Sequence, residues 1–165
     1  MRRVSSLQGG RGMWSLFLTA LGVVVADQLS KLWIRSNLLE GQSLFEVGFF
    51  KIIRGYNTGA VFGLFQGQSF ILTIIAFVGV AVLLLYAYLF NRRSSLLGNM
   101  LSRIGIGLVL GGAIGNLIDR LRFNGVTDFI SVGWWPAFNI ADSAIVVGVI
   151  LFAYSLLFLA KKHDG

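Results

Sequence analysis

The chain has 165 residues, of which 56% are hydrophobic and 13% are charged, and it carries a formal net charge of +7. Soluble domains contain roughly 25% charged residues, so this composition is too poor in polar side chains to cover a domain in water. Cysteine is absent, which excludes disulfides and thiolate chemistry, and the single histidine, His163, lies too near the chain end for a buried catalytic triad. We therefore expect an α-helical integral membrane protein that forms a single domain over residues 1–165.

Four stretches are apolar enough to cross a bilayer, which takes about 20 residues per helix. They cover residues 13–34, 69–90, 97–118 and 140–160. The first is interrupted by Asp27 and Lys31, and the third includes Arg103, whose long side chain can extend toward the interface. The sequence therefore predicts four transmembrane helices.

Basic residues predict the orientation of these helices. Eight of the 14 Lys and Arg residues lie in the N-terminal arm, between the second and third helices, and in the tail: Arg2, Arg3, Arg11, Arg92, Arg93, Arg103, Lys161 and Lys162. Short segments rich in Lys and Arg remain in the cytoplasm, so both termini are expected there, with loops 35–68 and 119–139 outside. The positive charge then favours contact with anionic membrane lipid. Nucleic acid is not an expected partner, because no basic stripe with interleaved aromatic residues is present.

The N-terminal region also has features of a cleavable secretory signal peptide. Three arginines precede an apolar run that ends at Ala26. The apolar character resumes after Asp27, at Leu29 and Trp33, so an uncleaved first helix is the favoured interpretation.

The loop at residues 35–68 is long for an unstructured connection. Apolar runs at 44–47, 49–53 and 60–62 are separated by glycines, which is typical of short strands. A small extracytoplasmic β-structure is therefore expected between the first and second helices, resting on the membrane surface or on the bundle.

Ionisable residues inside a span are costly, so each is a candidate functional residue. Asp27 and Lys31 lie four residues apart on one helical face, where an ion pair would neutralise both. This pairing is compatible with a role in a functional site, and the sequence leaves both a structural role and a site role open. Asp119 lies near the predicted end of the third helix, where the dipole disfavours an anion, and Arg120 beside it is the expected compensating charge.

The third helix also contains small residues at regular spacing. Gly111 and Gly115 form a face that allows another helix to approach closely. This packing role leaves Asn116 unexplained, although Asn116 lies on one helical stripe with Gly112 and Arg120.

Two further carboxylates, Asp128 and Asp142, lie at the outer membrane boundary. Singly, Asp142 is explained as the acid of a capping box with Asn139, and Asp128 as the centre of an Asx turn. Together in an apolar cleft, two carboxylates share one proton, so one acts as base and the other as acid. Such a pair activates water without a metal, thiol or histidine. The spacing alone leaves both explanations open.

Five ordered motifs carry a family resemblance. They are DQLSK at 27–31, NTGAVF at 57–62, GGAIGNLIDR at 111–120, VTDFI at 126–130 and FNIAD at 138–142. With these motifs the chain resembles lipoprotein signal peptidase, the bacterial signal peptidase II family, over about residues 13–160. The resemblance implies an aspartic endopeptidase of the bacterial cytoplasmic (inner) membrane. Such enzymes remove the signal peptide of a prolipoprotein by cutting before a diacylglyceryl-modified cysteine.

The resemblance also implies residue roles. Asp128 and Asp142 match the catalytic pair. Residues matching positions that bind substrate or support the site are Asp27, Lys31, Asn57, Gly59, Asn116, Arg120 and Asn139. No metal or other cofactor is implied, and cyclic peptide antibiotics of the globomycin type are the implied inhibitors.

Two functions of other classes are alternatives. A small ion-coupled transporter or channel subunit would use Asp27, Lys31 and Asp119 as a proton path, but the chain lacks the inverted repeats typical of such transporters. A structural assembly factor would tolerate the loss of any single acid. Both fit the motifs poorly.

Overall fold

The computed structural model describes residues 5–59, 65–90 and 99–163, with side chains described over 13–59, 65–85 and 99–157. Its elements in chain order are α1 (Ser5–Asn37), β1 (Ser43–Val47), β2 (Phe50–Asn57), α2 (Ser69–Phe90), α3 (Met100–Phe123), β3 (Val126–Val132), β4 (Trp135–Phe138) and α4 (Ile140–His163). The predicted strand at 60–62 lies outside the described residues, as do most of the basic side chains used to predict orientation.

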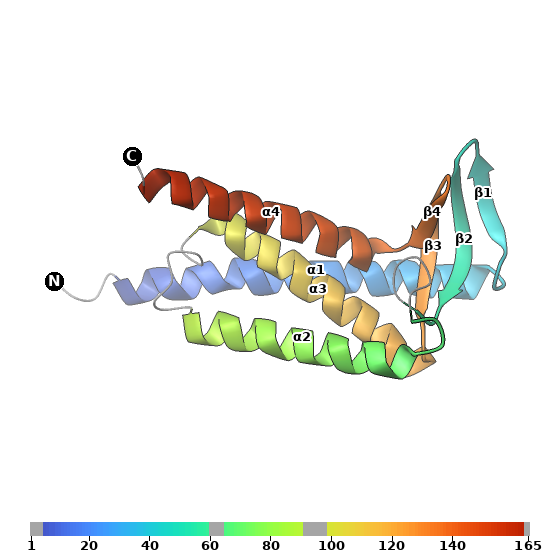
Figure 1. Cartoon of the computed structure of the whole chain (residues 1–165), viewed down its shortest axis with the longest axis horizontal. Coiled ribbons are helices and arrows are strands. Elements are labelled where there is room, and N and C mark those ends of the chain that lie inside the picture. Colours follow the sequence, from blue (N-terminus) through green and yellow to red (C-terminus); the bar gives the residue numbers. More distant parts are fainter. Residues whose placement is uncertain (1–4, 60–64, 91–98, 164–165) are drawn as a thin grey trace.

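Helix α3 forms the centre of the bundle, because α1, α2 and α4 all pack against it. The N-terminal end of α1 and the C-terminal end of α4 lie at one end of the bundle, and the sheet lies at the other (Figure 1). Three described stretches are long and apolar enough to cross a membrane: Met13–Asn37, Met100–Phe123 and Ile140–Leu157. In α2 the part with described side chains, Ser69–Leu85, is apolar but shorter. The predicted class, a four-helix membrane protein with a small β-structure, is confirmed.

Helices α1, α3 and α4 continue beyond their predicted C-terminal ends, and the stops of α1 and α3 have visible causes. Helix α1 continues to Asn37, where Arg54 Nη1 donates a hydrogen bond to the Leu38 carbonyl at 2.7 Å and so satisfies a backbone group at the helix end. Helix α3 continues to Phe123 and stops at Asn124, which adopts the left-handed conformation (φ 58°) and donates its N–H to the Arg120 carbonyl. Hydropathy ends α3 too early, because the charged Asp119 in its last turns is buried in protein and paired rather than exposed to lipid.

Glycines allow α3 to approach both of its main neighbours. A Cβ on Gly111 would lie 2.6 Å from the Ala20 carbonyl oxygen of α1, and one on Gly105 would lie 2.9 Å from the Gly148 carbonyl oxygen of α4. A Cβ on Gly115 would lie 2.6 Å from Asp27 Oδ2, so this glycine makes room for a charged side chain. The close-approach face predicted on α3 is confirmed.

A buried apolar cluster joins α1 to α3, and it includes Leu16 and Ala20 of α1. Both residues precede Ala26, the end of the run that resembles a secretory signal. The segment before Ala26 is therefore a packed part of the bundle.

The β-structure is a four-stranded antiparallel sheet in the order β1-β2-β3-β4. The β-structure predicted between the first two helices corresponds to β1 and β2, whereas β3 and β4 come from the loop between α3 and α4. Pairing of β2 with β3 runs from Phe50 opposite Val132 to Asn57 opposite Val126. Phe129 of β3 packs with α1 residues in a second buried cluster, which anchors the sheet on the bundle.

Replacing Gly111 with alanine is expected to lower the melting temperature of the detergent-solubilised protein, because the new methyl group would overlap the Ala20 carbonyl. Overpacking of this kind costs about 1–3 kcal/mol. Gly79 in α2 has no atom within 4 Å of its Cβ position, so Gly79→Ala is the matched control and should be neutral or slightly stabilising. Equal melting temperatures for the two variants would contradict the packing described here.

Candidate active site

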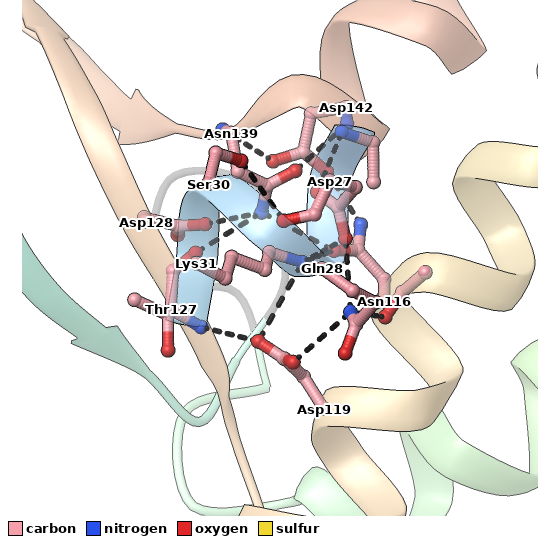
Figure 2. Close-up of polar contacts among 12 residues, drawn as sticks. Asp27, Gln28, Ser30, Lys31, Asn116, Asp119, Thr127, Asp128, Asn139 and Asp142 are labelled. Carbon is pink, nitrogen blue, oxygen red and sulfur yellow. Dashed lines mark hydrogen bonds and ion pairs between the residues drawn. The ribbon is translucent and has the colours of Figure 1, made fainter. Parts of the chain in front are cut away.

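Asp128 and Asp142 are brought together by Asn139, although they belong to different elements (Figure 2). Asp128 lies within β3, and Asp142 lies in the first turn of α4. Asn139 Nδ2 donates to Asp128 Oδ1 at 2.7 Å, and the Asn139 backbone N–H donates to Asp142 Oδ2 at 3.2 Å. One fully buried asparagine therefore holds a carboxylate oxygen of each aspartate.

Of the two local explanations for these aspartates, the capping box at Asp142 is present in the structure and the Asx turn at Asp128 is not. Asn139 and Asp142 do form the predicted capping box, since the Asp142 N–H also donates to Asn139 Oδ1 at 2.9 Å. The Asx turn expected at Asp128 is wrong, because this residue lies inside a strand and its carboxylate accepts from distant side chains. The cap places Asp142 beside Asp128 instead of excluding Asp142 from a site.

Asn57, at the end of β2, holds the other oxygen of Asp128. Its Nδ2 donates to Asp128 Oδ2 at 2.9 Å, and its Oδ1 accepts from the Gly59 N–H at 2.9 Å. Arg120 Nη2 reaches the Gly59 carbonyl at 3.4 Å. The chain after β2 is thereby tied to both Asp128 and α3.

Asn116 connects α3 to the dyad. Its Nδ2 donates to Asp142 Oδ1 at 2.7 Å, while its Oδ1 accepts from Lys31 Nζ at 2.9 Å and from Asn139 Nδ2 at 3.2 Å. The two donors at Oδ1 determine which way the amide points, so Asn116 can only donate toward Asp142.

A buried ion-pair network lies behind the asparagines. Lys31 Nζ is 2.9 Å from Asp27 Oδ2 and 3.5 Å from Asp119 Oδ2, and Arg35 Nη1 is 3.3 Å from Asp119 Oδ1. The direct ion pairs of Asp119 are therefore with Lys31 and Arg35, and Arg120, the expected compensating charge, interacts with Asp119 at longer range. Sequence reasoning missed Arg35, although its spacing of four residues from Lys31 places both on one face of α1.

A cavity of about 870 Å³ opens onto the dyad. Its polar wall contains Asp128, Asp142, Asn57, Asn116 and Arg120. Its apolar wall has two parts. Three helices supply small and aliphatic side chains: Ala76 of α2, Ala113 of α3, and Ile145, Val146 and Val147 of α4. The sheet supplies larger ones as well: Tyr56, Val126, Trp135, Pro136, Ala137 and Phe138. The shape and lining suit a ligand with an apolar body and one polar segment next to the carboxylates.

The environment of Asp128 favours retention of a proton. Burial, followed by the charge of Asp142, raises the pKa of the Asp128 carboxyl to about 6. Hydrogen bonds from Asn57 and Asn139 and the charge of Lys31 act in the opposite direction. The described part of the chain holds no group of three or more His, Cys, Asp or Glu side chains able to hold a metal ion.

Every residue assigned to the site from the sequence lies in this one network. The nine are Asp27, Lys31, Asn57, Gly59, Asn116, Arg120, Asp128, Asn139 and Asp142. Three further contributors were missed: Gln28, Arg35 and Thr127. Gln28 directly follows Asp27, and Arg35 lies one helical turn after Lys31, so local spacing could have identified both. The contacts of Thr127 depend on where β3 meets α1 and α3.

Comparison with known proteins gives a consistent result. The family model described as signal peptidase (SPase) II matches residues 19–158. The lipoprotein signal peptidase of Dehalococcoides mccartyi strain BAV1 is 44% identical over 153 residues, which cover 93% of each chain. That of Moorella thermoacetica is 45% identical over 147 residues, covering 88% of this chain and 95% of the relative.

A solved structure titled as a bacterial membrane enzyme determined by the in meso method at 2.3 Å is also similar. It superposes with a TM-score of 0.76 at 35% identity, covering 86% of this chain and 87% of that chain. The matches are to a peptidase family, and the transporter and assembly-factor alternatives receive no support from them. From these matches, the chain belongs to the signal peptidase II family of lipoprotein signal peptidases.

Proposed function

We propose that this peptidase is an aspartic endopeptidase that cuts a prolipoprotein immediately before its diacylglyceryl-modified cysteine. In this proposal Asp128 and Asp142 share one proton and activate the attacking water. The observation that carries it is the joint hydrogen bonding of both carboxylates to Asn139, beside a cavity with an apolar wall. The relatives, which are lipoprotein signal peptidases, support the substrate class.

The reaction uses only the two carboxyl groups. The ionised carboxylate takes a proton from water as the water oxygen attacks the scissile carbonyl carbon, and the protonated carboxyl gives its proton to the carbonyl oxygen. The gem-diol intermediate collapses when the newly protonated carboxyl gives its proton to the amide nitrogen and the other carboxylate takes a proton from a diol hydroxyl. The C–N bond then breaks, which releases the signal peptide with a new carboxyl end and leaves a free amino group on the modified cysteine. Because coupled acids titrate as a pair, the proton belongs to the dyad rather than to one residue.

The remaining network residues would hold the dyad and the substrate. Asn57, Asn116 and Asn139 donate to the carboxylates, while Arg120 and Gly59 line the cavity beside them. The apolar wall would receive the helical signal peptide and the acyl chains of the modified cysteine. Membrane lipid and cyclic peptide inhibitors of the globomycin type would enter the same cavity.

In the proposed orientation the protein lies in the bacterial cytoplasmic (inner) membrane with both termini in the cytoplasm. The sheet and the dyad would then lie near the outer face. Support comes from the basic terminal segments and from the position of the sheet, opposite the free ends of α1 and α4 (Figure 1). This depth matches a substrate whose lipid anchors the scissile bond at the interface.

Asp128→Asn and Asp142→Asn are each expected to abolish cleavage, because each removes an acid–base group while nearly preserving side-chain shape. The measurement is cleavage of a purified diacylglyceryl-modified prolipoprotein in detergent, with the product sequenced at its new N-terminus. Melting temperatures establish that the variants are folded. Near-normal turnover by either folded variant would remove that aspartate from the mechanism.

The kcat/KM of the wild-type protein is expected to fall as the pH rises above about 6. Burial and the charge of Asp142 raise the pKa of Asp128 to about 6, and above that pH the dyad loses the shared proton. Since kcat/KM reports ionisations of the free enzyme, its logarithm should decline with a slope of −1. Melting temperatures over the same pH range exclude unfolding as the cause. A flat profile between about pH 5 and pH 8 would contradict the shared proton.

Asn116→Ala is expected to lower turnover about tenfold or more, because hydrogen bonds to charged groups contribute about 1.5–3 kcal/mol. Arg120→Ala should also lower turnover, since this side chain lines the cavity. Arg122, two residues further along α3, is exposed and does not line the cavity, so Arg122→Ala is the matched control. Unchanged turnover in Asn116→Ala and Arg120→Ala would remove their supporting roles.

A further inference from the structure

A buried carboxylate of α1 binds the backbone next to one member of the dyad. Asp27 Oδ1 accepts a hydrogen bond from the Ala141 N–H at 3.0 Å, one residue before Asp142. Asp27 has no exposed surface, and it fits only because Gly115 lacks a side chain. Helix α1 therefore holds the first turn of α4 at the point where that turn presents Asp142.

A second buried carboxylate does the same for the other member. Asp119 Oδ2 accepts from the Thr127 N–H at 3.0 Å, one residue before Asp128. Asp119 is also fully buried, and Arg35 bonds both to its carboxylate and to the Thr127 hydroxyl, the latter at 3.0 Å. The last turns of α3 therefore hold β3 at the point where the strand presents Asp128.

Lys31 joins these two holding points. Its ammonium group is 2.9 Å from Asp27 and 3.5 Å from Asp119, and it has no exposed surface (Figure 2). Without Lys31 two anions would face each other in a low-dielectric interior, which strongly disfavours ionised carboxylates. Lys31 is therefore the cation that the two carboxylates share, and Asp119 pairs in addition with Arg35.

We propose that Asp27, Lys31 and Asp119 form a positioning bracket, in which one ammonium group sets the spacing of the two catalytic carboxylates through the backbone beside each. The inference rests on the proposed catalytic function of Asp128 and Asp142. Its mechanical basis is that displacing a reacting group by about 1 Å can cost about 100-fold in rate. Asp27 and Asp119 are positioning residues in this scheme, because they contact Lys31, Gln28, Arg35 and backbone rather than the dyad.

The test must separate the backbone hydrogen bond from the charge. In a Lys31→Met background, Asp27→Asn and Asp27→Leu have the same formal charge and similar size, but only asparagine retains an oxygen that accepts from Ala141. Each double variant removes one cation and one anion, so the charge balance of the network is preserved. The equivalent pair at Asp119, in the same background, tests the hydrogen bond to Thr127.

The leucine variant of each pair is expected to have a kcat about 100-fold below that of the asparagine variant, with KM unchanged. The fall of its kcat/KM with rising pH, called the alkaline limb here, should also begin at a lower pH. The charged groups near Asp128 are Asp142, which raises its pKa, Lys31, which lowers it, and Arg120, a cation that both variants retain. Since Lys31 is absent from both variants, a downward shift reports a more distant Asp142 or a wetter Asp128.

The control variant weakens the fold far from the bracket. Ser102 and Ser155 are buried and share a hydrogen bond of 2.6 Å between the first turn of α3 and the later part of α4. The start of α3 and the C-terminal part of α4 lie toward the end of the bundle opposite the sheet (Figure 1). Ser102→Ala should lower the melting temperature and leave the alkaline limb in place. A loss of folded protein reduces the amount of active enzyme but does not move the pH profile of the molecules that remain active.

The outcomes distinguish the bracket from the dyad. If Asp128→Asn is inert while the asparagine and leucine variants share one kcat and one alkaline limb, the bracket is wrong and the dyad stands. If Asp128→Asn is active, the dyad fails and the bracket fails with it. Where a double variant has no turnover, infrared titration of the protonated Asp128 carboxyl gives the midpoint without activity. A lower midpoint in the leucine variant supports the bracket, and an equal midpoint overturns it.

Discussion

The buried ammonium group of Lys31 determines much of the architecture around the site. An unpaired charge at that depth costs several kcal/mol, so Lys31 requires anions from more than one element. Asp27 comes from the same helix and Asp119 from α3, which fixes how the two helices meet. Their approach is possible because Gly115 leaves space for the Asp27 carboxylate. Charge pairing and glycine packing therefore act as one constraint on α1 and α3.

The fold was predictable from the sequence where lipid determines the pattern. Continuous apolar runs predicted the helices, because a bilayer-facing helix needs apolar residues on every exposed side. The prediction failed where protein replaces lipid, as in the last turns of α3, in which Asp119 is buried and paired. The pairing of β2 with β3 was also missed, since strands about 70 residues apart in the chain share no local signal.

The candidate site was predictable to a similar extent and for a related reason. Polar residues in apolar surroundings are conspicuous, so the assigned side chains all fall within one network. Arg35 was missed because it follows the predicted end of the first helix and reads as an ordinary loop cation. Asp142 shows a different limit, since capping and membership of a carboxylate pair looked like competing explanations. In the structure the cap is the means by which Asp142 is placed next to Asp128.

The three asparagines explain how a pair of carboxylates can remain half-protonated inside a bundle. Each of the four carboxylate oxygens of Asp128 and Asp142 accepts one hydrogen bond, from Asn57, Asn116 or Asn139. These donors favour the ionised form, whereas burial and mutual repulsion favour the neutral form. Amides supply the donors without adding positive charge, which would drive both carboxylates to ionise. The balance between amide donors and burial therefore suits a dyad that keeps one proton, and each oxygen retains a lone pair for water or substrate.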